Sequence, residues 1–255
     1  MVELGGAAIG IGGAVAMAAI FFLAGLVKGT VAFGLPLVAV PLLAQLMPLP
    51  TAAALSILPI IASNLVQAVQ TRRAASVLRR LWPLFLALPV TLAVSVRLIA
   101  ALDAKVLSLL VGALVEIFVL LQLTGRMPAI SPKAERPVLA LSGVAAGVLG
   151  GATSFYAFPS LQVFLAMRLA PLEFVFATSA MFVVGSLVLG AGFAALGLLR
   201  GNELVASLAA LAPLLLGLQI GQALRRRLSI PAFRVFVLAF LALTGASMIW
   251  HGLGL

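Results

Sequence analysis

The sequence contains no cysteine, a single histidine and very few charged residues. Of its 255 residues 9% are charged, with 16 Lys and Arg against 6 Asp and Glu. Without cysteine there is no disulfide framework, thiolate zinc site or cysteine nucleophile. One histidine and no His/Asp/Glu cluster argue against a metal-dependent or Ser/His/Asp intramembrane enzyme. No G-x-x-x-x-G-K-[ST] motif occurs, so we expect no direct use of ATP and no cofactor.

The chain contains long stretches without charged residues. The composition is 64% hydrophobic and the mean hydropathy is +1.29. No Asp, Glu, Lys or Arg occurs in residues 29–71, 137–167, 174–199 or 204–224. A membrane-crossing helix needs about 20 apolar residues, so each stretch is long enough to cross. The basic residues cluster between apolar segments, which favours membrane lipid over nucleic acid as the partner. We therefore expect a multi-pass membrane protein.

Glycine, proline and charge divide the chain into apolar segments. They lie near 5–27, 31–48, 51–70, 82–100 and 105–124, and then near 137–150, 154–167, 172–199, 204–223 and 235–252. Residues 125–136 form a polar linker. The predicted fold is an all-α polytopic bundle of about 8 to 10 hydrophobic segments, with a first transmembrane repeat in 1–124 and a second in 137–255.

The two halves carry the same residues at the same spacing. Gly25, Gly29 and Pro41 recur as Gly143, Gly147 and Pro159. After a short insertion, Pro48, Ala54, Ser56 and Ser63 recur as Pro171, Ala177, Ser179 and Ser186. Matching at fixed spacing is the mark of an internal repeat.

The loop charges predict that the repeats are inverted. One loop of the first half has Arg72, Arg73, Arg79 and Arg80, whereas the equivalent loop of the second half has only Arg200. At the next loop the bias is reversed: the first half has Arg97 and Lys105, and the second has Arg225, Arg226, Arg227 and Arg234. Lys and Arg collect on the cytoplasmic side, so this exchange favours five crossings per half, opposite orientations and both termini outside. Eight full helices, with each Gly/Pro-interrupted pair forming one broken element, remain the alternative.

These motifs resemble those of the TauE/SafE sulfite exporter family over nearly the whole chain. The second half has a glycine-rich run from Gly143 to Ser154, then Pro159, Pro171 and Ala177-Thr178-Ser179. The first half has Gly25 to Pro36 with fewer adjacent glycines, and Ala54-Leu55-Ser56 lacks the threonine. The resemblance implies transport of sulfite, an organosulfonate or a related organic acid across the cytoplasmic membrane.

The interrupted segments hold the candidate substrate-binding residues, because irregular backbone within a bilayer must be buried or line a cavity. Half-helices after the glycines would aim N–H groups at a central anion, and Lys28 would add charge. The candidates are Lys28, Gly29, Thr30, Gly34, Ser56, Ser63, Asn64, Gly150, Gly151, Thr153, Ser154, Thr178 and Ser179. The competing interpretations are helix packing for the glycines, bonding to their own helix for the hydroxyls, and an interfacial position for Lys28.

Glu116 is the one acid well inside an apolar segment. It is a candidate site for a coupling proton or cation, and pairing with a neighbouring basic side chain is the alternative. We expect a secondary transporter or facilitator of a small anion, with a non-transporting membrane scaffold or subunit as the rival function. The sequence leaves the oligomeric state open.

Overall fold

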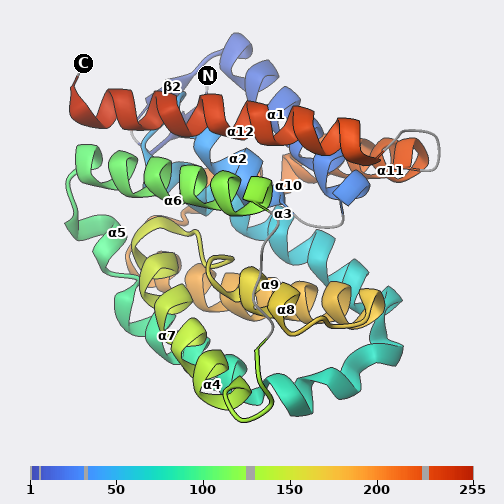
Figure 1. Ribbon diagram of the computed structural model, residues 1–255. Coiled ribbons are helices and arrows are strands. Elements are labelled where there is room, and N and C mark those ends of the chain that lie inside the picture. The colour runs from blue at the N-terminus through green and yellow to red at the C-terminus, as the bar shows by residue number, and fades with distance from the viewer. Residues whose placement is uncertain (1, 6, 32–33, 125–129, 226–229, 255) are drawn as a thin grey trace.

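The computed structural model is a bundle of helices with a short hairpin at its N-terminus (Figure 1). The structure describes residues 2–5, 7–31, 34–124, 130–225 and 230–254. Strands β1 (Val2–Leu4) and β2 (Ala7–Ile9) pair antiparallel, with Val2 opposite Ile9. We expected the first apolar segment to begin near residue 5, whereas helix α1 begins at Ile11. A left-handed Gly5, at φ 57°, makes the turn between the strands.

Each half of the chain contributes the same series of helices. The first half forms α1 (Ile11–Val31), α2 (Leu35–Leu43), α3 (Leu49–Gln70), the 3₁₀ helix η1 (Arg72–Val77), α4 (Leu78–Ser95), α5 (Leu98–Ala101) and α6 (Ala104–Thr124). The second forms α7 (Glu135–Thr153), α8 (Ser160–Ala166), α9 (Pro171–Ala195), α10 (Gly201–Ala209), α11 (Leu211–Arg225) and α12 (Ile230–Leu253).

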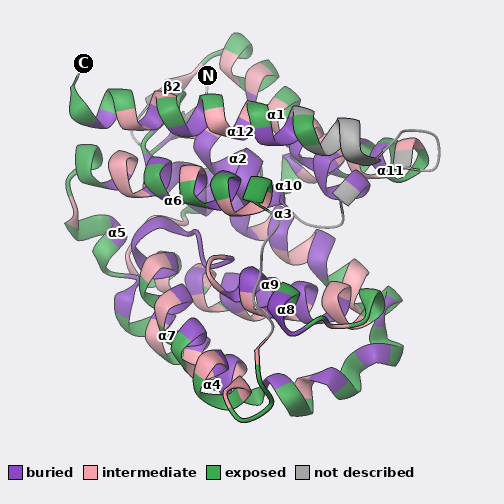
Figure 2. Ribbon diagram, viewed as in Figure 1, coloured by how far each residue is buried: buried purple, intermediate pink, exposed green. Residues whose placement is uncertain are grey.

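The helices have the length and surface of membrane spans. In the described part of the chain, seven are long and apolar enough to cross, and α12 is apolar over Val237–Leu253. Large apolar side chains point outward: Val94, Leu141 and Leu243 are each at least 70% exposed. Figure 2 shows buried residues on the inward faces and exposed residues on the outward faces of the same helices. The predicted α-helical membrane fold is thus confirmed.

Helices α2 and α8 are half-length segments that return through the bundle. Lys28, near the end of α1, bonds to Asn64, near the end of α3, so α1 and α3 run in the same direction. The chain between them must therefore turn back. At 1.5 Å per residue, the nine residues of α2 span about 14 Å and the seven of α8 about 10 Å, roughly half of a bilayer core. The chain thus has five segments in each half, but α2 and α8 are too short to be the full crossings that the count of ten assumed.

The pairing of helices is that of two inverted repeats. The equivalent helices α3 and α9 lie antiparallel, since Gln67 bonds to Ser179 and Ile57 contacts Gly190. The equivalent helices α6 and α12 are antiparallel too, because Gly252 lies against Lys105 whereas Gly245 lies against Glu116. A twofold axis in the membrane plane reverses the direction of equivalent helices in this way.

Two further extensive contacts join the halves: α1 packs on α11, and α7 packs on α4. Gly25 and Gly29 of α1 pack on Gly217 and Gly221 of α11, where a Cβ at Gly29 would lie 2.3 Å from the carbonyl oxygen of Leu218. Gly143 and Gly147 of α7 pack on α4 at Leu84 and Thr91 in the same parallel sense. Small residues four apart permit this close approach. The packing interpretation of these glycines is confirmed.

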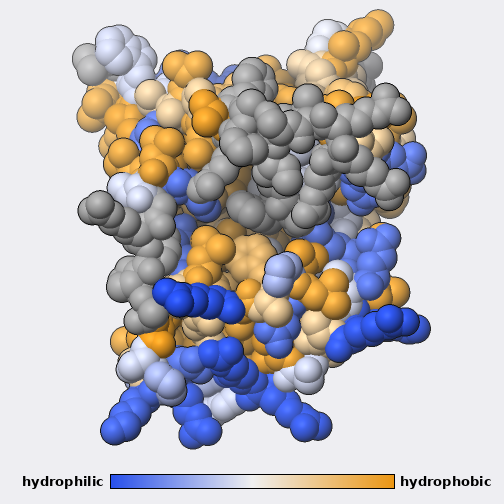
Figure 3. Space-filling model, turned by 45° about the vertical axis from the view of Figure 1, so that its right-hand side comes forward, coloured by the Kyte–Doolittle hydropathy of each residue, from blue (hydrophilic) through white to orange (hydrophobic). Residues whose placement is uncertain are grey.

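The two ends of the bundle differ in charge. The ion pair between Arg80 and Glu135 places the starts of α4 and α7 at one end, which we call the arginine end. Its exposed basic residues are Arg72, Arg73, Arg79, Arg80, Lys133, Arg136 and Arg168, and blue side chains gather low on the face in Figure 3. Arg126, Arg226 and Arg227 lie outside the described residues, and so do the side chains of Arg225 and Arg234.

The opposite end, which we call the hairpin end, holds β1, β2 and both described termini (Figure 1). Three exposed basic residues, Arg97, Lys105 and Arg200, lie there. The acids Asp103 and Glu203 lie beside them in the sequence.

Candidate substrate site

The ammonium group of Lys28 is buried inside the bundle. The residue is 2% exposed, and Nζ donates a 2.6 Å hydrogen bond to Oδ1 of Asn64 on α3. The amide nitrogen of Asn64 donates in turn to the carbonyl oxygen of Ile60, 2.8 Å away, which turns Oδ1 toward the lysine. The sequence left open whether Lys28 reaches the membrane surface, and the structure directs it inward.

Lys28 has no carboxylate partner among the described residues, whose one ion pair joins Arg80 to Glu135 at the arginine end. A cation withdrawn from water without a counter-ion is costly, and such residues in membrane spans are rare. One amide oxygen compensates a full positive charge only in part. The surroundings of Lys28 are therefore complementary to an anion.

A second polar contact joins α3 to α9 one helical turn beyond Asn64. The hydroxyl of Ser179 donates to Oε1 of Gln67 at 3.0 Å. Asn64 and Gln67 are three residues apart on α3 and share one face of the helix. Polar side chains therefore continue from α1, across α3, to α9.

Unsatisfied polar atoms surround the second half-helix. Ser160 Oγ and both side-chain polar atoms of Gln162, on α8, have no hydrogen-bond partner in the described structure. The same is true of Ser154 Oγ, before α8, and of Thr178 Oγ1, beside Ser179 on α9. All four residues are buried. An unpaired buried polar group costs about 1 to 3 kcal/mol, so such a concentration points to a ligand or water bound there.

The first half-helix begins next to the lysine. Gly34, in a left-handed conformation at φ 104°, precedes α2 and lies against the side chain of Val27, which adjoins Lys28. The N-terminus of a helix carries partial positive charge and free N–H groups. The start of α2 and the ammonium of Lys28 thus both contribute positive electrostatic potential, which attracts anions.

The glycines expected to break the second segment are helical. Helix α7 runs through Gly150 and Gly151 to Thr153, and the break starts at the left-handed Ser154, at φ 62°. A Cβ at Gly150 would lie 2.4 Å from Cβ of Tyr156, and one at Gly151 would lie 2.0 Å from Ser95 Oγ. Both positions are needed for close packing, so the expectation that they break the helix was wrong. Gly29 is likewise within α1 and packed on α11.

Four of the candidate hydroxyls bond to their own helices. Thr30 donates to Leu26, Ser56 to Ala52, Ser63 to Pro59 and Thr153 to Leu149, at 2.6 to 2.9 Å between side-chain and carbonyl oxygens. This is the usual behaviour of Ser and Thr in membrane helices. The alternative interpretation holds for these four. Of the remaining predicted residues, Lys28 contacts Asn64, Ser179 bonds to Gln67, and the hydroxyls of Ser154 and Thr178 have no partner in the described structure.

Glu116 lies on a different face of the bundle. It contacts Gly245 of α12 and lines an apolar groove of about 710 Å³ with Leu243, Ile249 and Trp250. Its Oε1 atom has no hydrogen-bond partner within the described chain. The pairing with a basic side chain is not seen there, since the one ion pair of the described residues lies elsewhere.

Ser160, Gln162 and Tyr156 are not among the residues predicted from the sequence. Gln162 is the one amide in the uncharged stretch 137–167, which was a usable signal. Tyr156 is the one tyrosine of the chain and is 1% exposed. Its hydroxyl bonds to Ser186 and to the carbonyl oxygen of Phe182 on α9, which holds the loop before α8 against that helix.

The comparison with known families agrees with this architecture. The family model described as sulfite exporter TauE/SafE matches residues 6–248, nearly the whole chain. The chain belongs to the TauE/SafE family. Membership of this transporter family, together with the membrane-spanning helices, makes the chain a multi-pass membrane protein of the transporter class. Searches of curated proteins and of solved structures returned no significant match.

Proposed function

We propose that this TauE/SafE protein is a secondary transporter or facilitator that moves a small anion across the cytoplasmic membrane. The substrate would be sulfite, an organosulfonate or a related organic acid. One observation carries the proposal: the ammonium of Lys28 is buried in the bundle, hydrogen-bonded to Asn64, and has no carboxylate partner among the described residues. A bound anion would supply the missing counter-charge.

Other buried groups of the bundle suit an oxyanion. The hydroxyls of Ser154, Ser160 and Thr178 and the amide nitrogen of Gln162 are potential donors without partners in the described structure. Oxyanions carry several acceptor oxygens, so they can satisfy several donors at once. The family description names sulfite, and this donor set is compatible with sulfite and with the sulfonate group of larger compounds.

The inverted repeats suggest how access would alternate. In carriers of this design the site lies between the repeats, near helices that are broken at mid-depth, and one set of helices rocks against the other. Here the equivalent helices α3 and α9 are joined through Gln67 and Ser179, and the half-helices α2 and α8 enter from opposite ends. Exchange between two arrangements of this contact would expose Lys28 to each side in turn.

Flux measurements test the proposal. Purified protein in liposomes would be given labelled sulfite, a sulfonate or a dicarboxylate, with and without a pH gradient. We expect saturable uptake of one anion class by the wild type. Lys28→Gln should lose at least about tenfold in rate, because the amide carries no charge to stabilise the anion. Lys28→Arg, which keeps the charge, should retain part of the flux.

Two results would contradict the proposal. Lys28→Gln that transports at the wild-type rate would show that the buried charge does not bind the substrate. A wild-type protein without flux for any anion on the panel, although folded and inserted, would favour a non-transporting scaffold or subunit.

A further inference from the structure

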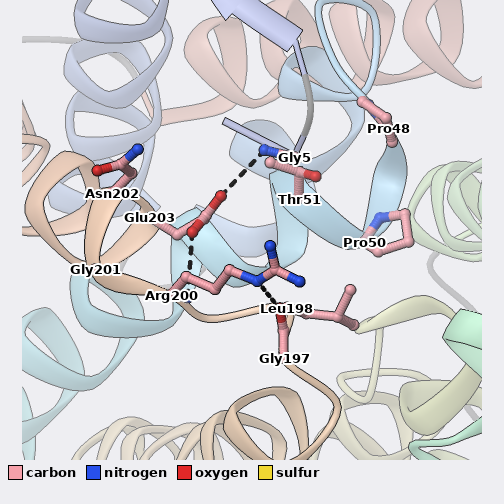
Figure 4. Close-up of a pocket in the computed structure, with 10 residues that line it drawn as sticks. All are labelled: Gly5, Pro48, Pro50, Thr51, Gly197, Leu198, Arg200, Gly201, Asn202 and Glu203. Atoms are coloured by element: carbon pink, nitrogen blue, oxygen red, sulfur yellow. Dashed lines mark hydrogen bonds between the residues drawn. The ribbon is translucent and has the colours of Figure 1, made fainter. Parts of the chain in front are cut away.

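A cavity of about 610 Å³ opens at the hairpin end of the molecule (Figure 4), and its lining includes none of the polar residues assigned to the substrate above. Three separate segments form its walls: the hairpin turn at Gly5, the start of α3 around Thr51, and the loop Gly197 to Glu203 that leads into α10. Cavities of 300 to 1,000 Å³ are typical for small-molecule sites. The volume is ample for a small oxyanion with part of its hydration shell.

Arg200 supplies the positive charge of this cavity. Its Nε donates to the carbonyl oxygen of Gly197 at 2.9 Å, which fixes the guanidinium plane. No carboxylate of the described residues lies within ion-pair distance of it. In Figure 4 the side chain points away from Glu203 and across the cavity toward Thr51 and Pro50. The two terminal nitrogens are therefore oriented to bind the oxygens of an anion, a geometry that suits guanidinium groups.

Glu203 also lines the cavity, and both oxygens of its carboxylate accept hydrogen bonds. Oε1 accepts a hydrogen bond from the Gly5 amide at 3.0 Å, and Oε2 accepts one from the Arg200 amide at 3.1 Å. The residue is 5% exposed and lies in the first turn of α10, where the helix end stabilises negative charge. Amide donors and the helix dipole thus compensate the carboxylate, while Arg200 remains without a counter-ion in the described structure.

Thr51 adds a neutral donor on the opposite wall. The residue is 5% exposed, lines the cavity and lies against Gly5. It lies in the first turn of α3, the same helix that carries Asn64 at the depth of Lys28. The cavity therefore stands at the hairpin-end terminus of the helix that leads to the central site.

We propose that this cavity is a docking site for small oxyanions, in which Arg200 and Thr51 hold the ion before it moves to Lys28 or after it leaves. The link to transport rests on the function proposed above, whereas anion binding in the cavity does not depend on it. Docking near a single exposed charge raises the local concentration of the anion and leaves the translocation step unchanged.

Flux from the hairpin end tests the docking role. Arg200→Gln should raise the half-saturating concentration of the transported anion about fivefold and leave the maximal rate within about twofold, because only the encounter is weakened. Lys28→Gln should instead lower the maximal rate. The control is Arg97→Gln, an exposed arginine at the same end that does not line the cavity. A reduced maximal rate with an unchanged half-saturating concentration in Arg200→Gln would overturn the docking role.

A labelling experiment tests the binding site without requiring transport. The chain has no cysteine, so Gly201→Cys places a unique thiol in the cavity, at a position where an added Cβ has nothing within 4 Å. Millimolar methanesulfonate should slow its reaction with an anionic thiol reagent, and the Arg200→Gln background should abolish that protection. Equal protection in both backgrounds, or none in either, would refute the site even if the central transport site is sound.

Discussion

The hydroxyl of Ser186 donates to the phenolic oxygen of Tyr156 at 2.6 Å, while Tyr156 donates to the carbonyl oxygen of Phe182 at 3.1 Å. These bonds fasten the loop before α8 to the middle of α9. The ring of Tyr156 also lies against Gly185, where a Cβ would come within 2.4 Å of it. The tyrosine thus positions the half-helix whose polar atoms we assign to the substrate.

Tyr156→Phe removes the two hydrogen bonds and keeps the ring. We expect the protein to lose about 2 kcal/mol of stability, since each of the two buried hydrogen bonds contributes about 1 kcal/mol. Because the loop before α8 is then held less firmly, anion flux should fall as well. Thermal unfolding in detergent and flux in liposomes would measure the two effects. Unchanged unfolding together with unchanged flux would show that these bonds do not hold the loop.

Asn64→Asp would place a carboxylate beside the buried ammonium of Lys28, which now contacts Oδ1 of Asn64 at 2.6 Å. The internal ion pair should exclude the substrate and abolish flux. Stability should stay close to that of the wild type, because the attraction within a buried ion pair roughly offsets the cost of removing both charges from water.

The matched variant is Asn64→Leu, which leaves the lysine without its partner and should lower the unfolding temperature. Wild-type flux in Asn64→Asp would mean that the anion binds elsewhere.

Gly29→Leu should prevent correct assembly, because a Cβ at this position would lie 2.3 Å from the carbonyl oxygen of Leu218 on α11. The backbone of α11 cannot move aside as a flexible side chain can, so we expect little monodisperse protein on size-exclusion chromatography. Gly12→Leu is the control on the same helix, since an added Cβ there meets nothing within 4 Å. Similar elution profiles for the two variants would contradict the close pairing of α1 with α11.

Glu135→Gln removes the partner of Arg80 at the arginine end, where Nε of Arg80 lies 2.9 Å from Oε2. The arginine side chain is 44% exposed, so water and salt screen the pair, and its loss should cost under about 1 kcal/mol. Flux should remain unchanged. A large loss of stability in an unfolding experiment at physiological salt would show that this pair contributes more than exposed ion pairs usually do.

Single cysteines would establish the orientation. The arginine end should face the cytoplasm, because Lys and Arg flanking membrane spans are retained there. Ser76 at that end and Ala104 at the hairpin end are both exposed. A maleimide that cannot cross membranes should label Ala104→Cys in intact cells and label Ser76→Cys only after permeabilisation. The reverse pattern would invert the assignment of sides.

The sequence predicted the order of segments well because charge and hydropathy act locally. The spacing shared by Gly25 and Gly143, and the exchange of basic loops, led to the inverted repeats seen in the structure. The places where the helices break were harder to predict. Gly150 and Gly151 have the composition of a break, yet they serve as contact positions for Tyr156 and Ser95. Contacts between distant segments decide which role a glycine takes.

The candidate site was likewise predicted only in part. Lys28 and Asn64 stood out as polar residues in apolar surroundings, and they contact each other. Ser56 and Ser63 stood out equally, and they bond to their own helix. The direction of a serine side chain depends on what the neighbouring helix offers, and that is set by packing across the two halves. Composition therefore identified more polar residues than the site uses.

The cross-pairing of the halves has a consequence for the ancestry of the fold. Helix α1 packs on α11 and α7 on α4, while α3 meets α9 and α6 meets α12, so every large contact here joins the first half to the second. Within one half, no described pair of helices makes a comparably extensive contact. Two identical copies inserted in opposite orientations could make all four pairings. The pairing is the one that two oppositely oriented copies of a single half, joined into one chain, would form.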